Sequence, residues 1–215
     1  MCWNKDVSLN TFIFSSFVLM LVVYNNAFTK YKIHMMNNKW MILFFFSFIV
    51  IQLIEYFIWK NINDPVYNKF FSTLAQTVLL LQPIASLMLI TNDKVRIPLI
   101  MTYLILCIPY SVNKIATSNI YSTVNKNGNL NWHFFNDSVI VWIVWLFFFL
   151  VSFVYQKIWT ALIFGLVTLI VTYINFREKN NIASMWCWIV NSIMVFCAFY
   201  ILIYLPFQDK KKIVC

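Results

Sequence analysis

Glycine and charged residues are both scarce in this chain of 215 residues, and each scarcity excludes a class of protein. The two glycines are too few for the glycine-rich loops that bind phosphate groups. Charged side chains make up 11% of the residues, against about 25% in a typical soluble domain. Because 62% of the residues are hydrophobic and 20% are aromatic, a water-soluble fold of this size could not bury its apolar surface. The composition therefore predicts an integral membrane protein.

Histidine is nearly absent as well. His34 and His133 are the two histidines, and they fall in loops predicted on opposite sides of the membrane. No cluster of cysteine and histidine has the spacing of a zinc site, so we expect neither a metal nor another cofactor. The last apolar run, residues 183–206, has no lysine, which excludes a retinal protein.

The net charge of +9 comes from basic residues that are spread over short loops, and the one basic block is Lys210–Lys212. This distribution suits lipid headgroups better than nucleic acid. The expected partners are therefore the lipid bilayer and a small-molecule ligand, and not nucleic acid.

Seven apolar runs approach the length that crosses a bilayer, whose core of about 30 Å needs about 20 helical residues. One run, residues 138–175, would cover nearly twice the bilayer as a single helix, so it is divided at Tyr155–Lys157. The sequence predicts one domain, an all-α bundle of seven transmembrane helices. The expected spans are residues 8–26, 40–59, 71–91, 97–113, 138–156, 158–175 and 183–206.

The counts of lysine and arginine set the predicted orientation. The N-terminus and loops two, four and six carry seven of these residues, whereas loops one, three and five and the C-terminus carry nine. The richer set also lies on shorter segments close to the spans. We therefore expect the N-terminus outside and the C-terminus in the cytoplasm, and the sequence does not say which membrane is involved.

One carboxylate, Glu55, interrupts the apolar run "IQLIEYFIWK" of the second span. An acid in hydrocarbon is costly and normally faces the interior of the bundle. Gln52 precedes it by three residues, on the same helical face. The seven-span topology brings further polar and aromatic residues to the same outer half, which gives a candidate ligand site of Glu55, Gln52, Gln76, Gln82, Trp188 and Asn191. The alternative is that Glu55 is a structural hydrogen-bonding partner.

Cysteine and tryptophan also gather on the predicted outer side. Cys2 and Cys187 could form a disulfide there in an oxidising compartment, or they could be ordinary buried thiols. The tryptophans form either an aromatic belt at the membrane interface or a stacking wall for a ligand; they are Trp3, Trp59, Trp132, Trp186 and Trp188.

Three functions stay open on these grounds. The favoured one is the binding or transport of a small ligand in an outer-half pocket around Glu55. The second is a structural or host-interaction membrane protein, in which Glu55 only satisfies a buried partner. The third, less favoured, is an intramembrane enzyme that uses Glu55 or an amino-terminal Cys2 as its reactive group.

The opening "MCWNKDVSLNTF" resembles the start of an uncharacterised family of small multi-pass membrane proteins that occur in bacteria and in large DNA viruses. Members begin Met-Cys-Trp-Ser or Met-Cys-Trp-Asn. The family also has an acid and a glutamine in span two, here Glu55 and Gln52, and a Gln-Pro pair in span three, here Gln82 and Pro83. Its last span begins with Trp and Cys, here Trp186–Trp188. The resemblance supports the architecture and implies no reaction, and the heavy use of Asn, Lys, Ile and Phe would suit a viral member.

Overall fold

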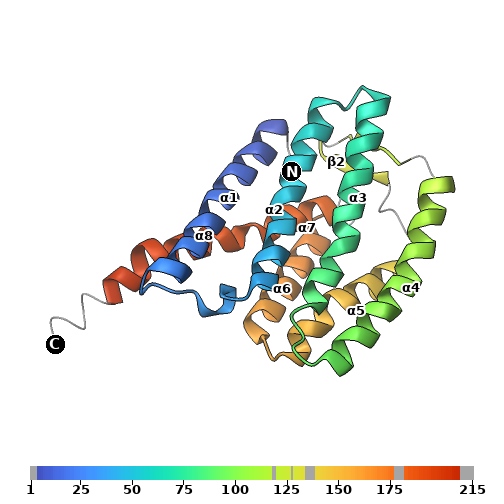
Figure 1. Cartoon of the computed structure of the whole chain (residues 1–215). Helices are drawn as coiled ribbons and strands as arrows, with labels where there is room; N and C mark the ends of the chain where they lie inside the picture. Colours follow the sequence, from blue (N-terminus) through green and yellow to red (C-terminus); the bar gives the residue numbers. More distant parts are fainter. Residues whose placement is uncertain (1–3, 118–119, 127, 134–138, 177–181, 209–215) are drawn as a thin grey trace.

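The computed structural model describes residues 4–117, 120–126, 128–133, 139–176 and 182–208. Most of the helices run up and down between two ends, and the C-terminal helical segment runs across them toward the left of the view (Figure 1). A helix overlies each of the seven predicted spans. The helices are α1 (Lys5–Phe28), α2 (Lys39–Lys60), α3 (Pro65–Leu87), α4 (Asp93–Thr117), α5 (Val139–Tyr155), α6 (Trp159–Phe176), α7 (Ile182–Val190) and α8 (Ser192–Phe199), with a 3₁₀ turn η1 (His34–Met36) and a π-helix η4 (Tyr200–Tyr204).

Six helical segments in the described part of the chain are long and apolar enough to cross a membrane. They are α1, α2, α3, α4, α6 and the segment Ile182–Gln208, which joins α7, α8 and η4. α5 is apolar too, but its 17 residues make it shorter, about 25 Å. The chain therefore has the build of a multi-pass helical membrane protein, as its composition predicts.

α2 lies at the centre of the bundle. α1 and α3 pack along its two sides and α7 crosses it on a third, and ten of its 22 side chains are buried. A helix that is apolar on all sides belongs in such an interior position. α4 is the opposite case, because Tyr103 is its one buried residue. Four of its apolar side chains are partly buried beside Tyr103, and most of the others are exposed.

An aromatic cluster joins α2, α5 and α7 in the core. The ring centroid of Trp186 lies 5.9 Å from that of Trp145 and 5.4 Å from that of Phe149, and the Phe48 ring contacts Trp186 edge-on. Trp186 is 2% exposed and Trp132 is 3% exposed. The interpretation of these two tryptophans as part of an interfacial belt is therefore wrong, since both are enclosed by protein.

A short hairpin covers one end of the bundle, between α4 and α5 in the chain. Strands β1 (Ser122–Val124) and β2 (Leu130–Trp132) pair antiparallel, with Ser122 opposite Trp132. Gly128 has a φ of 73° in the connecting turn, a left-handed conformation that glycine adopts without strain. The hairpin packs on α3 and α7, near the top of the view in Figure 1. The sequence pattern indicated only a polar loop here.

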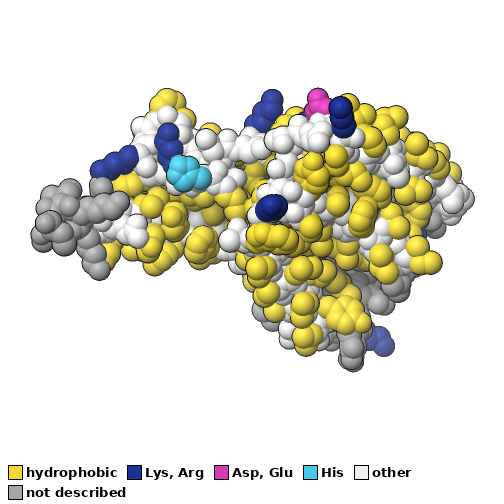
Figure 2. All heavy atoms as spheres, turned by 90° about the horizontal axis from the view of Figure 1, so that it is seen from below, with side chains coloured by type: hydrophobic (Ala, Val, Ile, Leu, Met, Phe, Trp, Pro, Cys, Tyr) yellow, Lys and Arg dark blue, Asp and Glu magenta, His cyan; other side chains and the backbone are white. Residues whose placement is uncertain are grey.

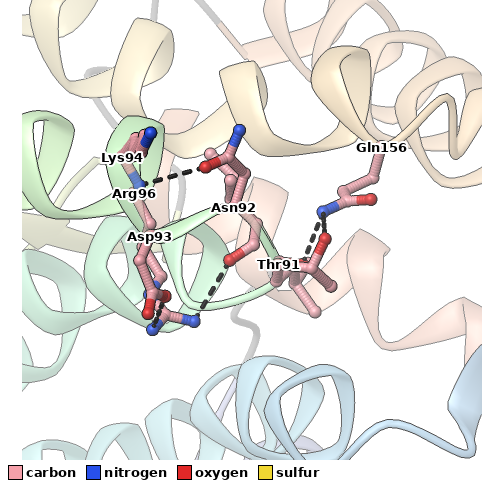
Figure 3. A network of polar contacts seen from close by, with 8 residues as sticks. Thr91, Asn92, Asp93, Lys94, Arg96 and Gln156 are labelled. Carbon is pink, nitrogen blue, oxygen red and sulfur yellow. Dashed lines mark hydrogen bonds and ion pairs between the residues drawn. The ribbon is translucent and has the colours of Figure 1, made fainter.

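The other end of the bundle is closed by polar contacts between the α3–α4 and α5–α6 turns (Figure 3). Gln156 donates its Nε2 hydrogens to the carbonyl oxygen of Leu89 at 2.9 Å and to Oγ1 of Thr91 at 3.4 Å. Arg96 pairs with Asp93 at the start of α4. The two contacts of Gln156 tie the end of α5 to the end of α3.

Pro83 lies inside α3 and has no N–H to donate to the carbonyl oxygen of Leu79. The indole Nε1 of Trp145 donates to that oxygen at 3.0 Å. A side chain of α5 thus replaces the hydrogen bond that the proline removes, in a place where lipid offers no partner.

Trp145→Phe should lower the free energy of unfolding by about 1–3 kcal/mol, because the Leu79 carbonyl is then buried without a partner. In a Pro83→Ala background the helix supplies its own N–H, so the same substitution should cost less. Chemical unfolding in detergent micelles, arranged as a double-mutant cycle, measures both values. If Trp145→Phe lowers the free energy of unfolding equally in the two backgrounds, Trp145 does not replace the hydrogen bond that Pro83 removes.

Candidate functional site

Glu55 lies five residues before the end of α2 and is fully buried. The hydroxyl of Ser184, in the first turn of α7, donates to Oε1 of Glu55 at 2.7 Å. The carboxylate therefore faces the interior of the bundle, as expected from the cost of exposing an acid to lipid.

Further polar groups continue from Glu55 along the line where α2 and α7 meet. Phe48, Gln52 and Glu55 follow each other on one face of α2, and Asn191 lies seven residues after Ser184, on the same face of α7. Nδ2 of Asn191 donates to the Phe48 carbonyl oxygen at 3.3 Å, so the two helices run in opposite directions. We call Glu55, Ser184, Gln52 and Asn191 the polar ladder.

The helix breaks at the lower end of the ladder. The backbone N–H of Asn191 donates to Trp188, three residues back, at 3.1 Å, instead of four residues back as in an α-helix. Its side chain supplies the missing bond, because Nδ2 donates to the carbonyl oxygen of Cys187 at 2.8 Å. Asn191 therefore satisfies the backbone at the point where α7 ends and α8 begins.

The centre of the ladder holds polar atoms that the described residues leave unpaired. Neither Nε2 nor Oε1 of Gln52 has a hydrogen-bonding partner among these residues, and the same holds for Oδ1 of Asn191. The hydroxyl of Ser15 on α1 is likewise buried and unpaired within the described chain. Ser15 and Gln52 each lie thirteen residues from the loop that joins α1 to α2, so they are at the same level.

Each such atom costs about 1–3 kcal/mol, and a buried atom of this kind calls for an explanation such as a bound water or ion. An amide, a carboxylate and hydroxyls can together donate and accept hydrogen bonds or supply oxygen ligands to a small cation. The ladder therefore carries the kinds of donor and acceptor that bind small polar molecules or cations. Since Glu55 and Gln52 are fully buried, this conformation is closed to water.

The structure does not bring every predicted site residue to Glu55. Gln82 lies five residues before the end of α3, and α3 runs antiparallel to α2, so Gln82 is in the other half of the bundle. It is fully buried, and both of its amide atoms are unpaired among the described residues. Gln82 is thus a separate buried polar group and not a member of the ladder.

Gln76 and Trp188 also take other positions. Gln76 lines a cavity of about 210 Å³ between α3, α4 and α5, together with Tyr103 and Trp145, and its Oε1 is unpaired within the described chain. Trp188 is half-buried, and its Nε1 donates to Oγ1 of Thr11 at 3.2 Å, which ties α7 to α1.

The cysteine prediction falls partly outside the described residues. Cys187 is buried and forms no disulfide with a described residue, and Cys2 lies outside the residues that the structure describes. The pairing of Cys2 with Cys187 therefore stays a prediction. Among the described residues, no group of three or more His, Cys, Asp or Glu side chains could hold a metal ion.

The hairpin is held over one end of the bundle by a residue that the sequence pattern did not single out. Oδ1 of Asn68, on α3, accepts from the backbone N–H of Ser122 at 2.9 Å, and Nδ2 donates to the carbonyl oxygen of the same residue at 2.9 Å. The hydroxyls of Ser72 and Ser122 lie 2.8 Å apart. The side chain of Asn68 thus acts as a strand edge for β1. Small polar residues such as Asn68, Ser72 and Ser184 occur in many apolar runs, so the sequence alone does not mark them as functional.

Comparison of the sequence with protein-family models and with curated proteins, and of the structure with solved structures, gave no match. The function is therefore inferred from the geometry of the site itself.

Asn68→Ala should detach the hairpin from α3 while the helices stay folded. The Ser122 amide loses its acceptor, so its hydrogen exchange should become faster. Mass spectrometry of exchange in micelles measures this, and Asn63→Ala, at an exposed position in the α2–α3 turn, is the matched control. Unchanged protection of residues 120–126 in Asn68→Ala would contradict the role given to Asn68.

The hairpin should also loosen on acidification. His133 stacks on Tyr121, with centroids 4.6 Å apart, and its Nε2 lies 2.8 Å from Oγ1 of Thr123. Partial burial lowers the pKa of His133 below its usual value, so the open hairpin binds the proton more tightly than the closed one. Protection of β1 should therefore fall as the pH drops below about 6.5. His133→Gln, measured by the same exchange experiment, should lose this pH dependence. A wild-type profile that does not change with pH once intrinsic exchange rates are corrected would contradict it.

Proposed function

We propose that this is a seven-helix membrane protein, with the N-terminus outside and the C-terminus in the cytoplasm, that binds or transports a small ligand at the polar ladder. The ligand is a small cation or a small polar molecule that donates hydrogen bonds, because a carboxylate and an amide oxygen are the strongest acceptors of the ladder.

The neighbours of α5 support the count of seven spans. One end of α5 is tied to the α3–α4 turn through Gln156, and the hairpin precedes its other end in the chain. α5 therefore runs beside α3 from the level of Leu79 to Leu89, and α3 is long enough to span a membrane. One side of α5 packs on α3 and α6, and its other side exposes Ile140, Ile143 and Phe147, an apolar surface that suits lipid.

The distribution of basic residues supports the orientation. The end of the bundle opposite the hairpin carries Lys30, Lys32, Lys39, Lys94, Arg96 and Lys157 on short turns. Short loops rich in lysine and arginine stay on the cytoplasmic side. This assignment puts Glu55, Ser184 and the hairpin in the outer half.

The observation that carries the proposed site is the amide of Gln52, buried beside Glu55 with neither its donor nor its acceptor paired among the described residues. A bound ligand or water would satisfy both atoms. The broken helix at Asn191 supports a transport role, because discontinuous helices near the middle of the membrane are typical of transporter binding sites. It also provides a point about which α7 could move to open the ladder.

The hydrogen bond between Ser184 and Glu55 supports the second candidate, a structural membrane protein. In that case the bond only ties α2 to α7, and no ligand enters. The two functions differ in what they require of the charge on Glu55, since a structural bond needs an acceptor whereas a cation site needs the carboxylate.

Glu55→Gln should keep the protein folded and abolish its response to ligand. We expect one member of a panel of sodium, potassium, calcium and choline chlorides, at equal ionic strength, to raise the thermal unfolding midpoint of the wild-type chain in micelles. A ligand at one hundred times its dissociation constant stabilises by about 2.7 kcal/mol. Asp64→Asn is the matched control, because it removes one carboxylate but keeps the cap of α3.

Glu55→Leu separates the two candidates further. It removes the acceptor of the Ser184 hydroxyl, so it should destabilise the fold in either case. A wild-type chain that responds to none of the salts, with Glu55→Gln as stable as the wild type, would favour the structural role. A full response in Glu55→Gln would remove Glu55 from the site.

A further inference from the structure

A groove of about 600 Å³ opens in the half of the bundle away from the hairpin. α6 packs on α7, whereas α8 packs on α1, so α6 and α8 diverge and leave the groove between them. Its walls are almost wholly apolar, with Phe44 and Phe48 of α2, Phe149 of α5, Phe164 of α6 and Phe196 of α8 among its lining residues. Figure 2 shows this end of the bundle from below, with hydrophobic side chains on both sides of the hollow.

The depth of the groove matches one leaflet of a bilayer. It extends from residues 32–35, in the loop before α2, as far as Phe48, nine residues after the start of α2 at Lys39. That distance is about 13 Å along a helix, nearly half of an apolar core of about 30 Å. Its volume lies within the range of about 300–1,000 Å³ that is usual for ligand sites.

The room in the groove comes from a small residue on α6. Gly165 lines it, and a Cβ atom added at this position would have no atom within 4 Å. The glycine is therefore not needed for helix packing. It keeps open a space that any larger side chain would occupy.

A polar cavity of about 550 Å³ adjoins the groove at its mouth. The two share His34, Met35 and Thr160. Lys32 lines the groove, and Lys157 lines the polar cavity. No Asp or Glu is among the described residues that line either cavity.

Lys157 holds a conformation that is unusual for its type. Its φ is 56°, in the left-handed region that a residue with a Cβ atom rarely adopts and that costs of order 1–3 kcal/mol. The backbone N–H groups of Ile158 and Lys157 donate to the carbonyl oxygens of Phe153 and Val154, which is the Schellman motif that ends a helix with a left-handed residue. Here the tight turn between α5 and α6 presents an ammonium group to the polar cavity.

We propose that the groove and the adjoining cavity together bind one phospholipid with an anionic headgroup. An acyl chain lies along the phenylalanines, and the phosphate lies at Lys32, His34 and Lys157. Each side chain of this site suits that occupant: the apolar length fits a leaflet, and the basic mouth lies at the level where headgroups lie. An anionic lipid already supplies the negative group that the basic mouth requires. A second copy of the chain is therefore not needed to supply it.

Native mass spectrometry of the full chain, released from micelles that hold equal amounts of phosphatidylglycerol and phosphatidylcholine, tests this site. The wild-type chain should retain one phosphatidylglycerol in preference to phosphatidylcholine. Lys157→Gly should lower this preference about fivefold, which is the contribution of one lysine near a membrane surface. Glycine suits the left-handed backbone, so the fold should not suffer. Lys69→Gln, which removes one exposed charge from α3, is the matched control.

Gly165→Phe fills the groove and should remove bound lipid of both kinds. Leu166→Phe adds a ring at the next position of α6, which does not line the groove, and should leave lipid binding unchanged. If Gly165→Phe does not fold, as judged by its circular dichroism, Gly165→Leu and Lys157→Gly carry the test. Equal retention of the two lipids by the wild-type chain, or full retention by Gly165→Phe, would overturn the proposal. A dimer that Gly165→Phe abolishes would assign the groove to a second copy and overturn it as well.

Discussion

Backbone N–H and C=O groups within a bilayer must find their partners inside the protein, because hydrocarbon offers none. In this chain a side chain is the partner at three places where regular structure is interrupted. Trp145 serves the carbonyl that Pro83 leaves free in α3, and Asn191 serves the carbonyl at the break between α7 and α8. Gln156 does the same for Leu89 beyond the end of α3. The long-range contacts of the bundle follow from these substitutions as much as from apolar packing.

Against this rule the unpaired atoms of Gln52 stand out. A chain that supplies a partner for a single carbonyl at the Pro83 kink nevertheless leaves a whole amide without a partner among the described residues, one turn from Glu55. Local rules of this kind are broken mainly at functional sites. Gln82 breaks the same rule in the other half of the bundle, where it is separated from the carboxylate. The contrast between the satisfied kinks and these two glutamines is the reason for placing the function at the ladder.

The sequence was sufficient for the helices and for the burial of Glu55, because hydropathy and the cost of a charge in lipid are strong signals. It failed for Gln82 because the third span was taken to begin at residue 71, whereas α3 begins at Pro65. The signal was available in Asp64 and Pro65, since an acidic cap followed by proline marks a helix start. It failed for Trp186 because composition does not tell an interfacial tryptophan from one in the core. Ser184 and Asn68 could not be found, because a single small polar residue gains meaning only from the neighbour that tertiary packing gives it.

The attachment of the hairpin to α3 has one more consequence. A two-stranded hairpin has two open edges, and an open edge can pair with a strand of another molecule. Asn68 occupies both backbone groups of Ser122 on the outer edge of β1, so a side chain blocks the place where a third strand would add. Neighbouring copies crowded in one membrane are thereby kept from joining through this edge, and a helix provides the protection without adding a strand.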